Sequence, residues 1–119
     1  MTYIDGFILP LREDRLDEYT AMAKTFERKA KELGAIRSVE AIGDGLEHGH
    51  TTDFFRSVQA QEGENVVFSF IVWPDKATRD SAWEKLMADP EMQPGAQPMP
   101  FDGKRMFWGG FKPFVGGEA

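Results

Sequence analysis

The stretch at residues 66–73, Val-Val-Phe-Ser-Phe-Ile-Val-Trp, constrains the fold of this chain more than any other. It is rich in β-branched and aromatic residues, is too short for a typical helix, and is followed directly by Pro74, so it predicts a strand that ends there. Successive side chains of a strand point to opposite faces of a sheet, and here both sets are apolar apart from Ser69. The stretch therefore predicts a central strand that is covered on both faces.

Length and composition limit the classes of protein to consider. The chain has 119 residues, which we interpret as a single domain over residues 1–119. It has no cysteine, which excludes disulfides and thiolate chemistry and suits a cytoplasmic protein. The 20 acidic and 14 basic residues give a net charge of −6, which disfavours nucleic acid and anionic membranes as partners. No apolar stretch reaches the roughly 18 residues of a membrane span, and the N-terminus has no leader pattern.

Two segments have the periodicity of amphipathic helices. Residues 14–33 carry an apolar stripe, with Asp14 as the expected N-cap and Gly34 placed to cap the C-terminus. Residues 75–88 form the second helix, with Asp75 as N-cap and Arg79 inside the apolar stripe. Asp-Pro at 89–90 ends this helix.

Further strands are expected at residues 3–11, 35–43 and 105–115, together with a short strand extension at 54–60. A polar, glycine-rich connection covers 43–50, a turn covers 61–65, and a long loop with four prolines covers 90–103. Gly109-Gly110 indicates a bulge or a close approach of backbone.

The resulting order, strand-helix-strand-strand-helix-strand, predicts an α+β fold of the ferredoxin-like βαββαβ type. Right-handed crossovers place both helices on one face of a four-stranded antiparallel sheet. Because several strands are apolar on the other face too, we expect a homodimer in which two sheets face each other around a shared core.

Six short motifs carry a resemblance to a known family. They are Tyr3-Ile4-Asp5-Gly6-Phe7, residues 66–71, Arg79-Asp80, Met87-Ala88-Asp89-Pro90, residues 100–106 (Pro-Phe-Asp-Gly-Lys-Arg-Met) and Gly109-Gly110-Phe111. Together they make nearly the whole chain resemble the DUF1428 (YbaA-like) family. The resemblance implies the dimeric α/β-barrel superfamily and no established activity. Other members of that superfamily are cofactor-free monooxygenases, muconolactone-isomerase-like enzymes, haem-processing proteins and ligand-binding regulators.

Two residues depart from the pattern that the resemblance implies. Phe55 stands where the family is expected to carry proline, and Trp83 stands where a smaller polar residue is expected. If position 83 lines a pocket in relatives, the pocket here is expected to be smaller or closed.

Asp5, Glu40 and Ser69 are the polar residues on otherwise apolar strands. If their faces meet in a cavity, they could orient or deprotonate a small substrate, because burial raises the pKa of a carboxyl group towards the range of a general base. The alternative is structural, with Asp5 paired to Arg79 or Arg105.

A second polar group lies where the long loop enters the last strand. Lys104 and Arg105 could hold a carboxylate or enolate oxygen with Asp102 positioning them. The alternative is a turn at Asp102-Gly103 followed by an ion pair that pins the loop. Arg79 either reaches the same cavity or extends its charged end into water.

Aromatic and histidine residues offer weaker candidates. Trp73, Trp83 and Trp108, with ten phenylalanines, could line an aromatic pocket or pack as ordinary core. His48 and His50 have a spacing that suits a metal, but no further ligand motif supports one, so we expect neither a metal nor a cofactor.

Two functional hypotheses follow. The first is a small-molecule-binding, cofactor-free enzyme acting at the dimer's cavity by proton abstraction or oxygenation of an activated compound, by analogy with the superfamily. Its candidate catalytic residues are Asp5, Glu40 and Asp102, and its candidate substrate-binding residues are Ser69, Arg79, Lys104, Arg105 and Trp108. The second is a non-catalytic dimeric module, stress-related or partner-binding, whose polar core residues are structural.

Overall fold

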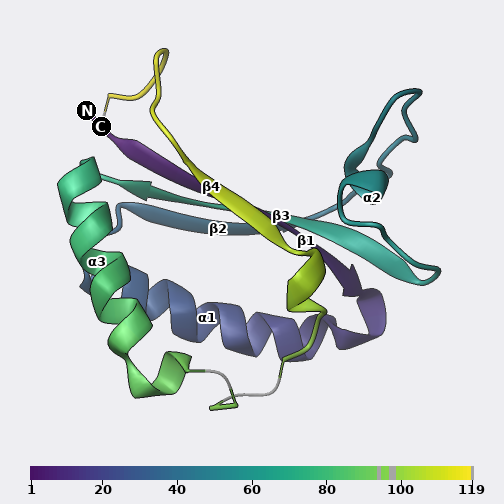
Figure 1. Cartoon of the computed structure of the whole chain (residues 1–119), viewed down its shortest axis with the longest axis horizontal. Coiled ribbons are helices and arrows are strands. Elements are labelled where there is room, and N and C mark those ends of the chain that lie inside the picture. Colours follow the sequence, from purple (N-terminus) through teal and green to yellow (C-terminus); the bar gives the residue numbers. More distant parts are fainter. Residues whose placement is uncertain (94, 97–98, 119) are drawn as a thin grey trace.

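The computed structural model describes residues 1–93, 95–96 and 99–118. In chain order the elements are β1 (Tyr3–Arg12), α1 (Leu16–Glu32), β2 (Arg37–Ile42), α2 (Phe54–Ser57), β3 (Glu64–Trp73), α3 (Lys76–Ala88) and β4 (Phe107–Phe111), with 3-10 turns at Glu13–Arg15, Pro90–Met92 and Gly103–Arg105. These residues form a mixed α/β structure with one antiparallel sheet of four strands and three helices. Helices α1 and α3 lie on one face of the sheet, and α2 lies on the other side (Figure 1).

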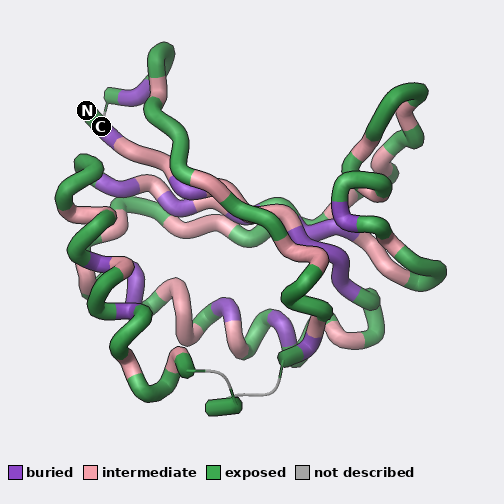
Figure 2. Tube along the Cα trace, viewed as in Figure 1, coloured by how far each residue is buried: buried purple, intermediate pink, exposed green. Residues whose placement is uncertain are grey.

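The predicted central strand is confirmed as β3. The strand order is β2-β3-β1-β4, so β3 pairs with a strand on each side. Its side chains Val67, Ile71 and Trp73 are buried beneath the helices, and Trp73 has no exposed surface. Figure 2 shows the buried segments concentrated in the two central strands, while β4 is largely exposed. The core therefore lies between the helix-facing side of β1 and β3 and the helices α1 and α3.

The other side of the sheet is apolar and mostly uncovered, and we call it the open face. Its apolar side chains are Ile4, Ile8, Val39, Ala41, Phe68, Phe70, Val72, Phe107 and Phe111, and the exposed Arg37 lies at its edge opposite Val72. Phe68, Phe107 and Phe111 are 44%, 45% and 63% exposed. At one end α2 contacts β3, and Val58 and Val66 are buried there. The helix-facing side of β3 is thus covered as predicted, whereas on the second face α2 covers only one end, and full coverage of that face stays a prediction.

Both long helices form where the periodicity predicts them, with one correction at the start of α1. Asp14 does not cap the helix, because its carboxylate pairs with Arg12 at 2.8 Å and a 3-10 turn precedes Leu16. Gly34 follows the helix with a φ of 112°, a left-handed conformation that glycine adopts without strain. Asp75 caps α3 as predicted, accepting a hydrogen bond from the Thr78 amide at 2.7 Å. Among the described residues, no helix is both long and apolar enough to cross a membrane.

Two predictions for the irregular segments are wrong. Residues 54–60 do not extend a strand, since residues 54–57 form the helix α2, capped by Asp53, whose Oδ1 accepts from the Arg56 amide at 2.7 Å. The last strand covers residues 107–111 and not 105–115, because Arg105 belongs to a 3-10 turn. Its pairing with β1 runs through Gly109-Gly110 without a bulge, and the Tyr3 ring covers Gly110 closely. Of the predicted loop at 90–103, residues 94, 97 and 98 lie outside the described residues.

Candidate functional site

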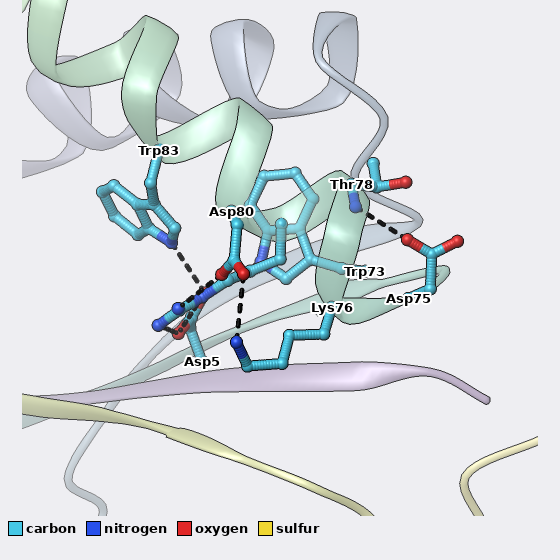
Figure 3. A network of polar contacts seen from close by, with 8 residues as sticks. Asp5, Trp73, Asp75, Lys76, Thr78, Asp80 and Trp83 are labelled. Atoms are coloured by element: carbon cyan, nitrogen blue, oxygen red, sulfur yellow. Dashed lines mark hydrogen bonds and ion pairs between the residues drawn. The ribbon is translucent and has the colours of Figure 1, made fainter.

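Asp5, one candidate base, lies in a closed network of hydrogen bonds. It is fully buried on β1, and the indole N–H groups of Trp73 and Trp83 donate to its Oδ2 at 2.9 and 2.8 Å (Figure 3). Arg79 donates from Nη2 to Oδ1 at 2.6 Å and from Nε at 3.1 Å. Because both carboxylate oxygens are occupied by donors of the chain itself, this geometry corresponds to the structural alternative, with Arg79 as the partner.

Arg79 is held on all sides and does not extend its charged end into water. The pKa of its guanidinium is raised, chiefly by hydrogen bonding to Asp5. Its Nη1 also contacts Asp80 at 3.1 Å, and its charge lies 5.2 Å from the centre of the Tyr3 ring. It does not line the cavity described below, and it instead forms the ion pair with Asp5 that was the structural alternative for that carboxylate.

Arg105 makes a second closed ion pair. Its Nη1 and Nη2 reach Glu64 at 2.6 and 2.8 Å, its Nε reaches Asp102 at 3.0 Å, and Nη1 also donates to the Gln59 carbonyl. These contacts lower the pKa of Glu64, with the hydrogen bond from Arg105 as the largest cause. The geometry is that of the predicted turn and loop-pinning pair. Lys104 is exposed beside it and contributes its backbone amide to Asp102.

A hollow of about 230 Å³ lies between the helix-facing side of the sheet and α1. Its described lining is Phe7, Leu9, Tyr19, Met22, Ala23, Phe26, Glu40, Ser69, Ile71, Trp83, Met92, Phe101 and Met106. Aromatic and methionine side chains dominate, and only Glu40 and Tyr19 among these residues carry an ionisable group. The hollow has the composition of a small-molecule site, a mostly apolar wall with a few polar groups. Trp83 lines the hollow without closing it, and the alternative expectation of a smaller pocket than in relatives stays a prediction.

Glu40 and Ser69, two of the predicted residues, meet at this hollow. They are direct cross-strand partners on β2 and β3, and Tyr19 on α1 donates its hydroxyl to Glu40 Oε1 at 2.6 Å. Burial of the carboxyl group is the largest influence on Glu40 and raises its pKa, while hydrogen bonds from Tyr19 and Ser69 lower it in part. Because Glu40 lies on an edge strand and is exposed as a residue, solvent moderates this shift. The pKa of Tyr19 is raised by burial and by the neighbouring carboxylate.

A groove of about 340 Å³ between α1 and β2 leads towards the same pair of residues. It shares Tyr19, Ala23 and Glu40 with the inner hollow and adds Lys24 and Glu27 from α1. The Tyr19–Glu40 hydrogen bond therefore stands between an outer groove and an inner, more apolar space.

The remaining candidates lie away from the hollow. Trp108 is on edge strand β4, on the same side as Phe7, but is 62% exposed. His48 stacks on Phe55 with ring centres 4.8 Å apart and lies 3.6 Å from Asp53. The described part of the chain holds no cluster of histidine and acidic residues able to bind a metal ion.

Sequence reasoning found Glu40 and Ser69 but missed Tyr19. In the sequence Tyr19 was one member of an apolar stripe, and its hydroxyl had no visible partner. The cavity also lies between the sheet and helix α1 of one chain, whereas the sequence pointed to a cavity at a dimer interface.

Fold and site together define a mixed α/β protein with a carboxylate-containing, mainly apolar hollow beneath its sheet. Residues 2–103 match the family model described as "Protein of unknown function (DUF1428)", and the chain belongs to this family. It is 44% identical over 115 residues to the "Uncharacterized protein YbaA" of Escherichia coli strain K12, covering 97% of this chain and 98% of that protein. The protein of that name from Shigella flexneri matches equally well. Among solved structures, the "De novo designed protein Foldit4" aligns with a TM-score of 0.48 at 10% identity, over 95% of this chain and 99% of that one.

Proposed function

We propose that this protein binds a small molecule in the hollow beneath its sheet and acts on it without a cofactor, with Glu40 as the base. The observation that carries the proposal is the position of Glu40, whose carboxyl group lines an apolar hollow, is bonded to Tyr19 and has no cation among the described lining residues. A carboxyl group whose pKa is raised by burial is a stronger base than an ordinary carboxylate, which suits it to accept a proton from a substrate. Of the two reactions considered, proton abstraction is the better supported.

The proposal assigns different roles to the predicted residues. Glu40 is the catalytic residue, and Ser69 and Tyr19 are positioning residues that hold its carboxyl group. The closed ion pairs of Asp5 and Arg105 support structural roles for both, together with Arg79 and Asp102. Lys104 and Trp108 lie outside this site.

We further propose that two chains associate through their open faces, as in a dimeric α/β barrel. The strand order, with α1 and α3 on one side, supports the ferredoxin-like arrangement on which such a barrel is built. The exposed phenylalanines of the open face support a partner, since soluble proteins rarely leave large contiguous apolar patches in water. A non-catalytic module that binds another protein through this face is the second candidate, favoured by the same surface.

A matched pair of α1 variants tests the binding site. Ala23 is buried and lines the hollow, whereas Ala21 is exposed on the same helix. Native mass spectrometry of freshly purified protein is expected to show a retained small molecule, which Ala23→Leu displaces by filling the space and Ala21→Leu leaves in place. If no molecule is retained and no small-molecule library member raises the melting temperature, the hollow has no ligand and the proposal fails.

A further inference from the structure

We infer that the ligand of the hollow is an uncharged aromatic compound of one or two rings that carries a hydrogen-bond donor. This inference rests on the proposed function and names the class of molecule that the same site would take. It is argued from the size of the hollow, from the character of its wall and from the charge of its polar end.

Size and wall set the first limit. An apolar cavity of about 150 Å³ is enough to hold benzene, so about 230 Å³ accommodates one or two rings. Aromatic side chains and the adaptable thioethers of Met22 and Met106 suit a flat, polarizable ligand. A long alkyl chain would not be contained, and a sugar would leave most of its hydroxyls without partners.

Charge sets the second limit. The described wall offers one carboxyl group and no lysine, arginine or histidine, so an anionic ligand would lie beside Glu40 with nothing to neutralise it. A cation could pair with Glu40, but moving both charges out of water into an otherwise apolar wall costs free energy that offsets much of this attraction. An uncharged ligand avoids both penalties.

The polar end then selects a donor. Glu40 Oε1 accepts a hydrogen bond from the Tyr19 hydroxyl, and Ser69 also forms a hydrogen bond with this carboxyl group, so the carboxyl group already accepts hydrogen bonds from hydroxyl donors. A ligand O–H or N–H can join this set or replace Tyr19. Tyr19 is thereby a competitor as well as a positioning residue, and its removal should strengthen ligand binding.

A ring-matched series tests the class by calorimetry on the full chain at neutral pH. The probes are 2-naphthol, naphthalene, 2-naphthoate and 2-naphthylmethylamine, which share a ring system and differ in donor and charge. We expect 2-naphthol to bind at least about tenfold more tightly than naphthalene, the factor that one hydrogen bond to a charged acceptor provides, and more tightly than either ion. Equal binding of 2-naphthol and naphthalene, or tightest binding of either ion, would overturn the inference while leaving the site intact.

Two variants assign the effect to the proposed residues. Glu40→Gln should reduce the preference for 2-naphthol over 2-naphthoate, whereas the exposed Glu84→Gln on α3 should not. Tyr19→Phe should tighten 2-naphthol several-fold and leave naphthalene unchanged, an effect that a purely structural tyrosine would not produce. A Tyr19→Phe variant that folds and binds 2-naphthol more weakly counts against the inference. If none of the four probes binds the wild-type protein, the inferred class of ligand is wrong, whereas the proposed function is decided separately by the retained-ligand and library tests.

Discussion

Two carboxylates on the same side of the sheet have opposite surroundings. Asp5 receives two indole N–H groups and the fork of Arg79, so its charge is fully compensated. Glu40 receives only hydroxyl groups, and burial raises its pKa. The first carboxylate is tied to a cation, whereas the second belongs to a carboxyl group whose pKa is raised by burial. Because of this contrast, we assign a structural role to Asp5 and a catalytic role to Glu40.

Asp5→Asn is expected to lower the free energy of unfolding by about 3–5 kcal/mol, measured by urea denaturation. The change removes the buried carboxylate that pairs with the partly buried Arg79, which then keeps its weaker, exposed contact with Asp80, and replaces the acceptor of two indole N–H groups by an uncharged amide. Asp80→Asn is the matched control, because it removes an exposed partner of the same arginine and should lower the free energy by about 1 kcal/mol or less. Equal losses in the two variants would mean that Asp5 contributes no more than a surface ion pair.

Glu40 should make stability depend on pH in a direction opposite to that of the ion-paired acids. The pKa of Glu40 in the folded protein lies above its ordinary value of 4.5. The contribution of Glu40 to the free energy of unfolding is therefore fully present below pH 4.5 and is lost as the pH rises through the folded pKa. Glu40→Gln cannot titrate and should therefore gain stability relative to the wild type as the pH rises from about 4 to 8. Denaturation curves across this range measure the difference, with the exposed Glu84→Gln as the control for removing one acidic group elsewhere. A difference for Glu40→Gln that stays constant with pH would contradict the raised pKa.

At the scale of elements, edge strand β4 is attached by few side chains. The turn before it is attached to β3 by the two parallel bonds between Arg105 and Glu64, and to the segment between α2 and β3 by the bond from Arg105 to the Gln59 carbonyl. The strand itself has five residues, two of which are glycines. Its position therefore depends strongly on one arginine.

Arg105→Lys should lower the free energy of unfolding by about 1–3 kcal/mol, because an ammonium group cannot reproduce the planar fork. Hydrogen exchange of the β4 amides should accelerate more than that of β3, and the exposed neighbour Lys104→Gln should change neither.

The stabilisation by the Arg105–Glu64 pair also depends on pH. The pKa of Glu64 is lowered, so its contribution is present above its ordinary value of 4.5 and is lost as the pH falls through the folded pKa. If exchange in β4 is unaffected by the lysine, the arginine does not hold the strand.

The sequence predicted the elements whose patterns are long and missed those decided by contacts. Both long helices and β3 follow from periodicity and β-propensity. Helix α2 was mistaken for a strand because Phe54 and Phe55 suggested one, while the Asp53 cap that starts it spans only three residues. Glu40 was found because a carboxylate interrupts an apolar strand. Its partner Tyr19 could not be found, since its hydroxyl acquires a role only when α1 packs over β2.

At the scale of the whole molecule, the sheet separates two surfaces with different tasks. The helix side contains the core, the Asp5 network and the hollow with Glu40, whereas the open face presents phenylalanines to solvent. A partner on the open face would thus leave the groove between α1 and β2 accessible from the opposite side. Dimerisation and ligand binding are therefore expected to be separable by mutation.

Phe68→Glu tests this separation, because Phe68 lies on central strand β3 within the open face, 44% exposed and with its ring 5.9 Å from that of Phe70. A charge placed there should weaken self-association at least about thirtyfold, the factor for roughly 2 kcal/mol at a central contact. Met87→Glu introduces the same charge at an exposed position of α3, away from that face, and should leave association unchanged. Sedimentation at micromolar concentration should give the mass of two chains for the wild type and Met87→Glu and of one chain for Phe68→Glu.

The Phe68→Glu monomer should still bind 2-naphthol, since the hollow lies wholly beneath its own sheet. A wild-type protein that sediments as one chain would remove the proposed dimer but not the site, whereas loss of binding in a folded monomer would show that the two surfaces are coupled.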